Sequence, residues 1–336
     1  MSESFDAIVL GLGAMGSAAA YQLAKRGKRV LGLDQYAPPH TLGSTHGDTR
    51  ITRQAIGEGA EYVPLSLRSY EIWREIERLT GRDLLTVTGG LIMASQSNHA
   101  PMHNSENFLQ TTIDAARRYD IPHEVLDAAE IRTRFPQFHL FGDELGYYEK
   151  PAGFLRPERC IEAQLALARH FGASIHIQEQ ALSYQPGASG DQVTLTTNRG
   201  TYTAGQLIVT AGSWISTLLE ERYARYFTVY RQVLYWFAIK ASLAPFLPGA
   251  FPIFIWERPH SSIYGFPAID GSAGGVKVAT EDYDSPTSPA AVTREVSSEA
   301  TQQMYAKHIA NGLPGLSERC VKAISCLYTV TPDGKF

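Results

Sequence analysis

The feature that most constrains the fold is a glycine-rich turn near the N-terminus, between a short apolar run and an alanine-rich stretch. Its glycines, Gly11, Gly13 and Gly16, have the spacing Gly-x-Gly-x-x-Gly. In a strand–turn–helix unit, the first glycine allows a tight turn and the second lets backbone N–H groups approach a pyrophosphate. The third lets the helix pack on the strand, and the helix N-terminus attracts phosphate. The motif therefore predicts a dinucleotide-binding site, but it does not distinguish FAD from NAD.

The flanking residues complete a βαβ unit. We expect a strand over residues 6–10, a helix over 17–26 that Gly27 closes, and a second strand over 28–33. Asp34 follows that strand and is placed to accept hydrogen bonds from a ribose. A glycine turn that binds no ligand explains the pattern less well, because the strand, the helix and Asp34 all stand where a dinucleotide-binding unit requires them. The unit implies a parallel sheet and an α/β fold.

The composition limits the possible partners. A chain of 336 residues, 44% of them hydrophobic, has room for a cofactor domain and a substrate domain. Its 30 basic and 34 acidic residues form no block of one sign, so we expect neither nucleic acid nor a membrane as a partner. Glycines interrupt the N-terminal apolar run, which argues against a signal peptide. Cys160, Cys320 and Cys326 form no CxxC pair, so we expect no metal, no disulfide scaffold and a cytoplasmic protein.

The rest of the chain predicts α+β elements and one functional loop. Residues 36–59 are rich in Pro, His, Gly, Thr and Arg and are too long for a bare connector. We expect helices over residues 63–79, 127–135 and 156–171 and a short one after Ser213. A hairpin is expected over 193–209. Two-residue periodicity over residues 226–239, 251–256, 262–266 and 275–279 predicts a mixed or antiparallel sheet that could carry a substrate pocket.

The functional loop has a run of small residues from Gly43 to Thr49, followed by Arg50 and Arg53. Small residues would let the loop lie against a planar cofactor. The two guanidinium groups, three positions apart, could hold anionic groups or stack on a ring. The alternative is an ordinary solvated loop with surface arginines.

Three motifs of the chain resemble a known family. The run from Pro38 to Gly59, with its Gly-Asp-Thr-Arg core, is similar to the monomeric sarcosine oxidase and N-methyltryptophan oxidase family, FAD-dependent amine oxidases of the D-amino acid oxidase-like superfamily. Ile263–Pro267 with Gly275–Val278, and Cys326–Thr329 with Thr331–Asp333, resemble two further motifs of that family. The resemblance covers essentially the whole chain. It implies oxidation of a small secondary amine or N-methyl amino acid to an imine, which hydrolyses to an aldehyde and an amine, while oxygen becomes hydrogen peroxide.

The resemblance also implies the domain organisation. A Rossmann-type FAD-binding domain would consist of residues 1–86, 150–222 and 326–336. It would be interleaved with a substrate domain of residues 87–149 and 223–325, in a monomeric protein. Two alternatives remain open at this point: an NAD-dependent dehydrogenase that uses only the glycine motif, and a truncated, inactive FAD-binding protein.

By resemblance, Cys326 carries FAD as a thioether on the 8α-methyl group. A thiolate is the required nucleophile, and nearby positive charge lowers the pKa of a thiol. The alternative is a buried structural cysteine, which we expect for Cys160 and Cys320. Lys277 matches a lysine that faces the flavin and promotes its reaction with oxygen, as a fixed cation stabilises developing superoxide. Its alternative is an exposed lysine on a strand.

Further residues take roles from the same resemblance. His46 and Arg50 would contact the flavin ring, and Arg53 would bind the substrate carboxylate. Tyr264 and Tyr328 match pocket tyrosines, although a strand tyrosine is often a core residue. The remaining expected cofactor-binding residues are Gly11, Gly13, Ala14, Met15, Gly16, Asp34, Gln35, Ser44, Thr45, Thr49, Ala181, Ala211, Gly212 and Trp214.

The chain departs from the family pattern in two places. Glu281 stands four positions after Lys277, where the family has a histidine. A carboxylate there would repel a carboxylate and attract an ammonium group, so we expect a substrate other than sarcosine. The chain also ends at Phe336, whereas family members continue into a closing strand and helix and a substrate-binding lysine. We therefore expect an uncovered sheet edge, with consequences for stability and activity.

Overall fold

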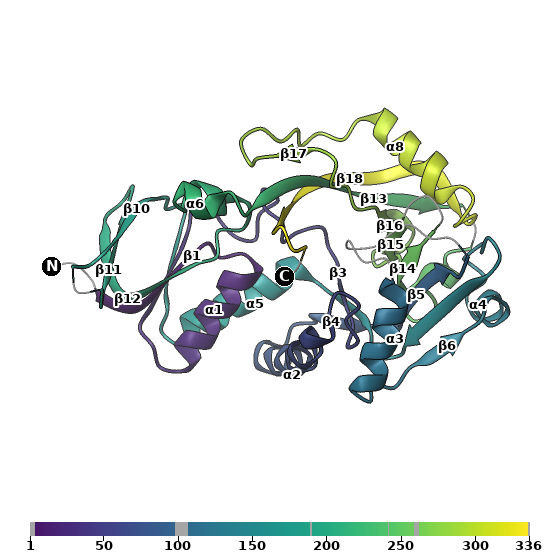
Figure 1. Ribbon diagram of the computed structural model, residues 1–336, viewed down its shortest axis with the longest axis horizontal. Coiled ribbons are helices and arrows are strands. Elements are labelled where there is room, and N and C mark those ends of the chain that lie inside the picture. Colours follow the sequence, from purple (N-terminus) through teal and green to yellow (C-terminus); the bar gives the residue numbers. More distant parts are fainter. Residues whose placement is uncertain (1–3, 98–106, 189, 241, 259–261, 335–336) are drawn as a thin grey trace.

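The computed structural model describes residues 4–97, 107–188, 190–240, 242–258 and 262–334. Residues 1–3, 189 and 335–336 of the expected FAD-binding domain, and 98–106, 241 and 259–261 of the expected substrate domain, lie outside this description. The molecule is elongated, with a large sheet towards each end and the helix α2 (Val63–Thr80) between them (Figure 1). Within the described residues, no helix is both long enough and apolar enough to cross a membrane.

A six-stranded sheet contains the glycine turn. Its order is β10-β11-β12-β1-β2-β9, and β12, β1, β2 and β9 are parallel. The helices α1 (Ala14–Lys25) and α5 (Pro157–His170) pack together on one face, over Val9 and Leu12. The expected βαβ unit and hairpin are both confirmed. The strand bounds are β1 Ser4–Leu10, β2 Val30–Asp34, β9 Ser174–Ile177, β10 Ala181–Pro186, β11 Val193–Thr197 and β12 Thr201–Val209.

A second, mixed sheet forms the other end. Its order is β17-β13-β16-β15-β14-β5-β7-β6, and β18 also pairs with β13. Most pairs are antiparallel, but β14 and β5 are parallel. Strands β13 and β18 run side by side along the top of the view (Figure 1). The strand bounds are β5 Gly90–Ser95, β6 Glu124–Leu126, β7 Glu144–Glu149, β13 Thr228–Ile239, β14 Ile253–Glu257, β15 Ser262–Phe266, β16 Val276–Ala279, β17 Pro286–Thr287 and β18 Leu316–Val330.

The two faces of the mixed sheet differ, because side chains alternate along each strand. Phe237, Phe254 and Trp256 form part of a core on the face covered by α4 (Ala128–Arg134) and α8 (Ser298–Met304). On the opposite face, Lys277 pairs with Phe266 and with Trp236, and Cys326 pairs with Gln232 of the same strand as Trp236. Directly opposed residues share a face. The strand register therefore places Lys277 and Cys326 on one face of the sheet.

A small, separate sheet lies between the two large ones (Figure 1). It has the order β3-β8-β4, and β3 lies inside the segment that was expected to be a loop. The helix α3 (Phe108–Arg118) contacts strands β5 and β7 of the mixed sheet. The bounds are β3 Arg50–Thr52, β4 Leu85–Val87 and β8 Gly153–Leu155, with short helical turns at Ala60–Tyr62, Gly212–Thr217, Glu221–Ala224, Ala244–Phe246, Gly271–Gly274 and Tyr305–Ile309.

The Cys326 motif lies at the end of the longest strand. Residues 326–330, which the expected FAD-binding domain includes, extend β18 and pair with β13 as far as Val330 opposite Thr228. A 15-residue strand thus continues through the point where the motif begins. Local sequence gave no sign of that partner, which lies about a hundred positions earlier in the chain.

Candidate active site

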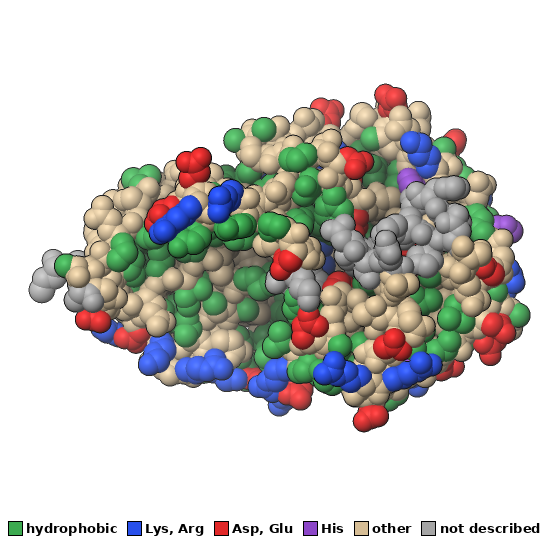
Figure 2. Space-filling model, viewed as in Figure 1, with side chains coloured by type: hydrophobic (Ala, Val, Ile, Leu, Met, Phe, Trp, Pro, Cys, Tyr) green, Lys and Arg blue, Asp and Glu red, His purple; other side chains and the backbone are tan. Residues whose placement is uncertain are grey.

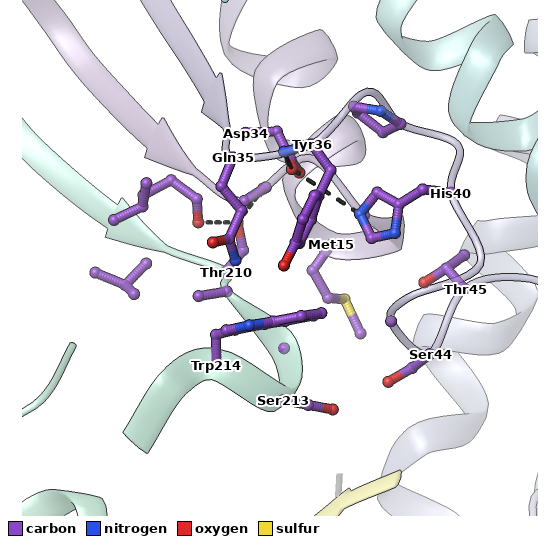
Figure 3. Close-up of a pocket in the computed structure, with 18 of the residues that line it drawn as sticks. Met15, Asp34, Gln35, Tyr36, His40, Ser44, Thr45, Thr210, Ser213 and Trp214 are labelled. Carbon is purple, nitrogen blue, oxygen red and sulfur yellow. Dashed lines mark hydrogen bonds and ion pairs between the residues drawn. The ribbon is translucent and has the colours of Figure 1, made fainter. Parts of the chain in front are cut away.

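A cavity of about 660 Å³ lies at the carboxyl ends of the parallel strands β1 and β2. This is the usual ligand position in open α/β sheets, and the volume suits a cofactor. Residues from the glycine turn, the end of β2, the loop after it and the end of β12 line the cavity (Figure 3). On the face seen in Figure 2, hydrophobic side chains gather in a hollow over this sheet.

The three motif glycines are each required for a different reason. Gly11 has a φ of 92°, and a Cβ there would lie 2.6 Å from the carbonyl oxygen of Thr210. A Cβ on Gly16 would lie 1.7 Å from the carbonyl oxygen of Gly11, so this glycine permits the contact between α1 and β1. A Cβ on Gly13 would meet nothing closer than 3.6 Å, yet Gly13 lines the cavity. Protein packing does not require this glycine, and the open space beside it allows a ligand to approach the backbone closely.

Asp34 closes the same cavity from the end of β2. One carboxylate oxygen accepts the N–H of Leu12 and the other accepts the N–H of Tyr36, both at 2.8 Å. The side chain is 6% exposed. Each carboxylate oxygen has a second lone pair, so Asp34 can still accept hydrogen bonds from ribose hydroxyls.

Most of the expected cofactor-binding residues line this cavity. Sequence reasoning missed Tyr36 and His40, whose rings are 5.0 Å apart, and Trp214 lies 5.5 Å from Tyr36 (Figure 3). Their signal was available, because Tyr36 is two positions after Asp34, where ligands of such sheets bind. The expected residues that line the cavity are Gly11, Gly13, Ala14, Met15, Asp34, Gln35, Ser44, Thr45, Ala181, Ala211, Gly212 and Trp214.

Lys277 is buried on the mixed sheet. Its ammonium donates to the carbonyl oxygens of Gly47 and Thr49, at 2.7 and 2.9 Å, and to the hydroxyl of Thr49 at 3.2 Å. It also lies 4.5 Å from the centre of the Phe266 ring. The side chain is 3% exposed, so the interpretation as an exposed lysine is wrong. Burial, together with the charge of Arg50, holds the pKa of Lys277 well below its usual value.

Cys326 is fully buried on the same face of the sheet. Burial raises the pKa of its thiol, and the charges of Arg50 and Lys277 act in the opposite direction. We expected positive charge to lower this pKa below its usual value. Both cations are present, but burial outweighs them. Cys160 is buried as expected and its pKa is raised to about 12, whereas Cys320 is only partly buried.

Two further residues of the loop contact its own backbone. The guanidinium of Arg50 donates to the carbonyl oxygen of Ser44 at 2.8 Å. Nε2 of His46 lies 3.1 Å from the carbonyl oxygen of Gly43, which can only accept, so Nε2 carries the proton. Burial lowers the pKa of His46 to about 4, so the ring is neutral near pH 7 and Nδ1 is an acceptor. Nδ1 is buried without a hydrogen-bond partner among the described residues, and a donor from a cofactor would satisfy it.

The remaining expected site residues lie around this centre. The hydroxyls of Tyr264 and Tyr328 are 3.3 Å apart. Glu281 interacts with Tyr328 through its charge and hydrogen-bonds to Tyr283. Arg53 forms a buried ion pair with Glu58, and its guanidinium lies 5.3 Å from the Phe108 ring. Glu58 thus occupies one nitrogen of this guanidinium, whereas its Nε is buried without a hydrogen-bond partner among the described residues and stays available to a substrate carboxylate.

One loop joins the two halves of the site. Its first part, Gly43, Ser44 and Thr45, lines the cavity at the glycine turn. Its next part, Gly47 and Thr49, accepts the ammonium of Lys277. A long cofactor can therefore extend from the glycine turn to the face of the mixed sheet. The open space beside Gly13 and the buried Nδ1 of His46, which lacks a hydrogen-bond partner among the described residues, both fit FAD. The ADP part would lie at the glycine turn.

Comparisons with known proteins show the family of this chain. Monomeric sarcosine oxidase from Streptomyces avermitilis is 43% identical over 337 aligned residues, which cover 100% of this chain and 85% of that protein. N-methyl-L-tryptophan oxidase from Salmonella gallinarum is 31% identical and is covered to 85%. The solved structure of NikD, described as an unusual amino acid oxidase, has a TM-score of 0.83 at 25% identity and covers 99% of this chain, which covers 84% of that chain. Residues 6–336 match the model of the family described as FAD dependent oxidoreductase, and the chain belongs to this family.

Proposed function

We propose that the protein is a flavin-dependent oxidase of a small secondary amine or N-methyl amino acid. The observation that carries this is the location of Lys277 and Cys326 on one sheet face, which the loop of residues 43–53 connects to the dinucleotide cavity. The relatives named above, which are sarcosine and N-methyltryptophan oxidases, support the substrate class. An NAD-dependent dehydrogenase is not favoured, because the family is FAD dependent.

The residues of the site divide the work as follows. When bound, FAD would accept a hydride equivalent from the carbon next to the amine nitrogen and pass two electrons to oxygen. Arg53 would orient the substrate carboxylate, with Tyr264 and Tyr328 beside the amine. Lys277 would stabilise negative charge that develops on oxygen. Water hydrolyses the imine to an aldehyde and an amine, and oxygen leaves as hydrogen peroxide.

We also propose the domain division and a monomeric state. Strands of the parallel sheet come from residues 4–34 and 174–209, and strands of the mixed sheet come from 90–149 and 228–330. This distribution supports the limits at residues 86, 149 and 222. The proposed FAD-binding domain consists of residues 1–86, 150–222 and 326–336, and the proposed substrate domain consists of residues 87–149 and 223–325. The substrate and oxygen are the expected partners.

The direct test of the function uses the purified holoenzyme without oxygen. Addition of an N-methyl amino acid should bleach the flavin absorbance, and admission of oxygen should restore it with formation of hydrogen peroxide. A flavin that stays oxidised with every N-methyl amine offered would contradict the oxidase and leave an inactive FAD-binding protein as the explanation.

Covalent attachment of FAD through Cys326 is part of the proposal. The wild-type protein should keep its yellow colour in the pellet after acid precipitation, because a thioether survives denaturation. Cys326→Ser should release all of its flavin into the supernatant, since a hydroxyl is a far weaker nucleophile. Cys160→Ser is the matched control and should behave as the wild type. Colour retained in the Cys326→Ser pellet would rule out this attachment site.

Glu281 should influence the choice of substrate. Its charge reaches Tyr328, so a substrate with a second ammonium group should be preferred over sarcosine. Glu281→His should shift the ratio of kcat/KM between N-methyl lysine and sarcosine towards sarcosine by about tenfold, about 1.4 kcal/mol. Asp284→Asn, at an exposed neighbouring position, is the control. An unchanged ranking of the amines in Glu281→His would show that this carboxylate does not select the substrate.

A further inference from the structure

The loop segment of residues 47–55, which carries Arg50 and Arg53, lies antiparallel to the segment of residues 149–158. In the middle, β3 and β8 pair over only three residues each. A glutamate stands at each end of this short ladder, Glu149 on one side and Glu158 on the other. Each carboxylate accepts backbone N–H groups from the opposite segment.

Glu149 fixes the backbone that follows Arg53. One of its oxygens accepts the N–H of Gln54 at 2.7 Å. The other accepts the N–H of Ala55 at 3.1 Å and the hydroxyl of Tyr147 at 2.8 Å. The side chain is completely buried, so these bonds do not compete with water.

Glu158 fixes the turn of the loop whose carbonyl oxygens accept the ammonium of Lys277. It lies in the first turn of α5, and a single oxygen accepts the N–H groups of Gly47 at 2.6 Å and Asp48 at 3.1 Å. Asp48 has a φ of 67°, a left-handed conformation that residues with a Cβ adopt only rarely. The carbonyl oxygens of Gly47 and Thr49 on this same turn accept the ammonium of Lys277.

We propose that Glu149 and Glu158 are two independent positioning residues, Glu149 for Arg53 and Glu158 for the turn that holds Lys277. Neither needs to touch substrate or cofactor. Arg53 would bind the amine substrate, and Lys277 would act in the reaction with oxygen. Removing Glu149 therefore impairs flavin reduction by the amine alone, and removing Glu158 impairs reoxidation by oxygen alone. The assignment to half-reactions rests on the proposed function, whereas the positioning itself does not.

The hydrogen-bond pattern dictates the variants. Glu149 uses both oxygens, so Glu149→Gln must turn an NH₂ group towards an N–H or hydroxyl donor and lose a bond. Glu158 uses one oxygen for both bonds, so Glu158→Gln can keep them, whereas Glu158→Ala cannot. Glu144→Gln is the matched control. Glu144 is the first residue of β7, whose last residue is Glu149, and it is also buried. Its two oxygens accept the N–H groups of residues 141 and 142, which lie outside the loop.

The test measures two half-reactions and one structural signal on each purified holoenzyme. Glu149→Gln should raise the dissociation constant of an N-methyl amino acid in anaerobic flavin reduction about tenfold, with the reoxidation rate within about twofold of wild type. Glu158→Ala should slow reoxidation by oxygen about tenfold and leave amine binding within about twofold, and Glu158→Gln should remain close to wild type. Hydrogen exchange should rise at residues 54–55 in Glu149→Gln and at residues 47–48 in Glu158→Ala. Glu144→Gln should lose stability without changing either half-reaction.

Several results would overturn the proposal. These are equal damage to both half-reactions in Glu149→Gln or Glu158→Ala, unchanged hydrogen exchange at the loop, or a Glu158→Gln enzyme as impaired as Glu158→Ala. If Glu149→Gln does not fold, Tyr147→Phe removes one bond to the same carboxylate and should raise the amine dissociation constant alone. A wild-type flavin that no amine reduces would refute the proposed function, and the hydrogen exchange of the variants would still decide the positioning roles.

Discussion

Replacing Lys277 with methionine should slow the reaction of the reduced enzyme with oxygen by about a hundredfold or more. The ammonium is buried, held by three oxygen acceptors of the loop and placed beside Arg50 and Cys326, so no water can replace its charge. Reduction by the amine under anaerobic conditions should change only a few-fold. Stopped-flow measurement of flavin reoxidation at several oxygen concentrations gives the rate constant directly.

The pH dependence adds a second readout for Lys277. Burial holds its pKa well below the usual 10.5, so the ammonium loses its proton at a lower pH than an ordinary lysine. The wild-type rate with oxygen should therefore fall as the pH rises through that lowered pKa, and Lys277→Met should lack this limb of the profile. Lys322→Met is the control, since this exposed lysine packs on Trp236, as Lys277 does, and pairs with Asp48. A Lys277→Met enzyme that reoxidises at the wild-type rate would remove Lys277 from the mechanism.

The second large effect is expected from the glycine turn. Gly16→Ala should destabilise the protein by about 3 kcal/mol or more, because its Cβ would overlap the carbonyl oxygen of Gly11 and crowd the hydroxyl of Thr210. The loss of contact between α1 and β1 should also abolish FAD binding. Thermal unfolding and the flavin content after purification measure the two effects.

Two other glycines separate folding from binding. Gly13→Ala should fold with nearly normal stability, since its Cβ meets no atom within 3.6 Å, but it should bind FAD at least about tenfold more weakly through lost close approach. Gly142→Ala, where a Cβ meets nothing within 4 Å, should change neither property. Normal FAD affinity in Gly13→Ala would mean that the pyrophosphate does not approach this glycine.

Many of the residues that the sequence singled out line one cavity, because the signals in this part of the chain are local. The strand, the turn, the helix and Asp34 lie within about thirty consecutive positions, and backbone sterics and hydrogen-bond geometry relate them directly. The same holds for the hairpin that ends in β12. Tyr36 and His40 were missed although they follow Asp34 in the same local region, because the prediction relied on the glycines and the acid and did not extend to the aromatic residues just after them.

The catalytic half was predicted from motifs, but its geometry was not. Whether Lys277 is exposed or buried depends on which face of the mixed sheet is covered, and two-residue alternation fits either case. Glu149 and Glu158 carry no motif at all. The raised pKa of Cys326 is also a result of burial, and the ion pair between Arg53 and Glu58 joins two buried side chains.

By itself, then, the sequence determined the βαβ unit, the dinucleotide turn and the residues from which a flavin site can be built. Only the tertiary structure decided which of these residues meet and in what electrostatic state. The physical reason is the distance along the chain: Lys277 and the carbonyl oxygen of Gly47 are 230 positions apart. Their contact depends on strand pairing, on the order of strands in the mixed sheet and on the exclusion of water from the face they share, and no local pattern encodes these.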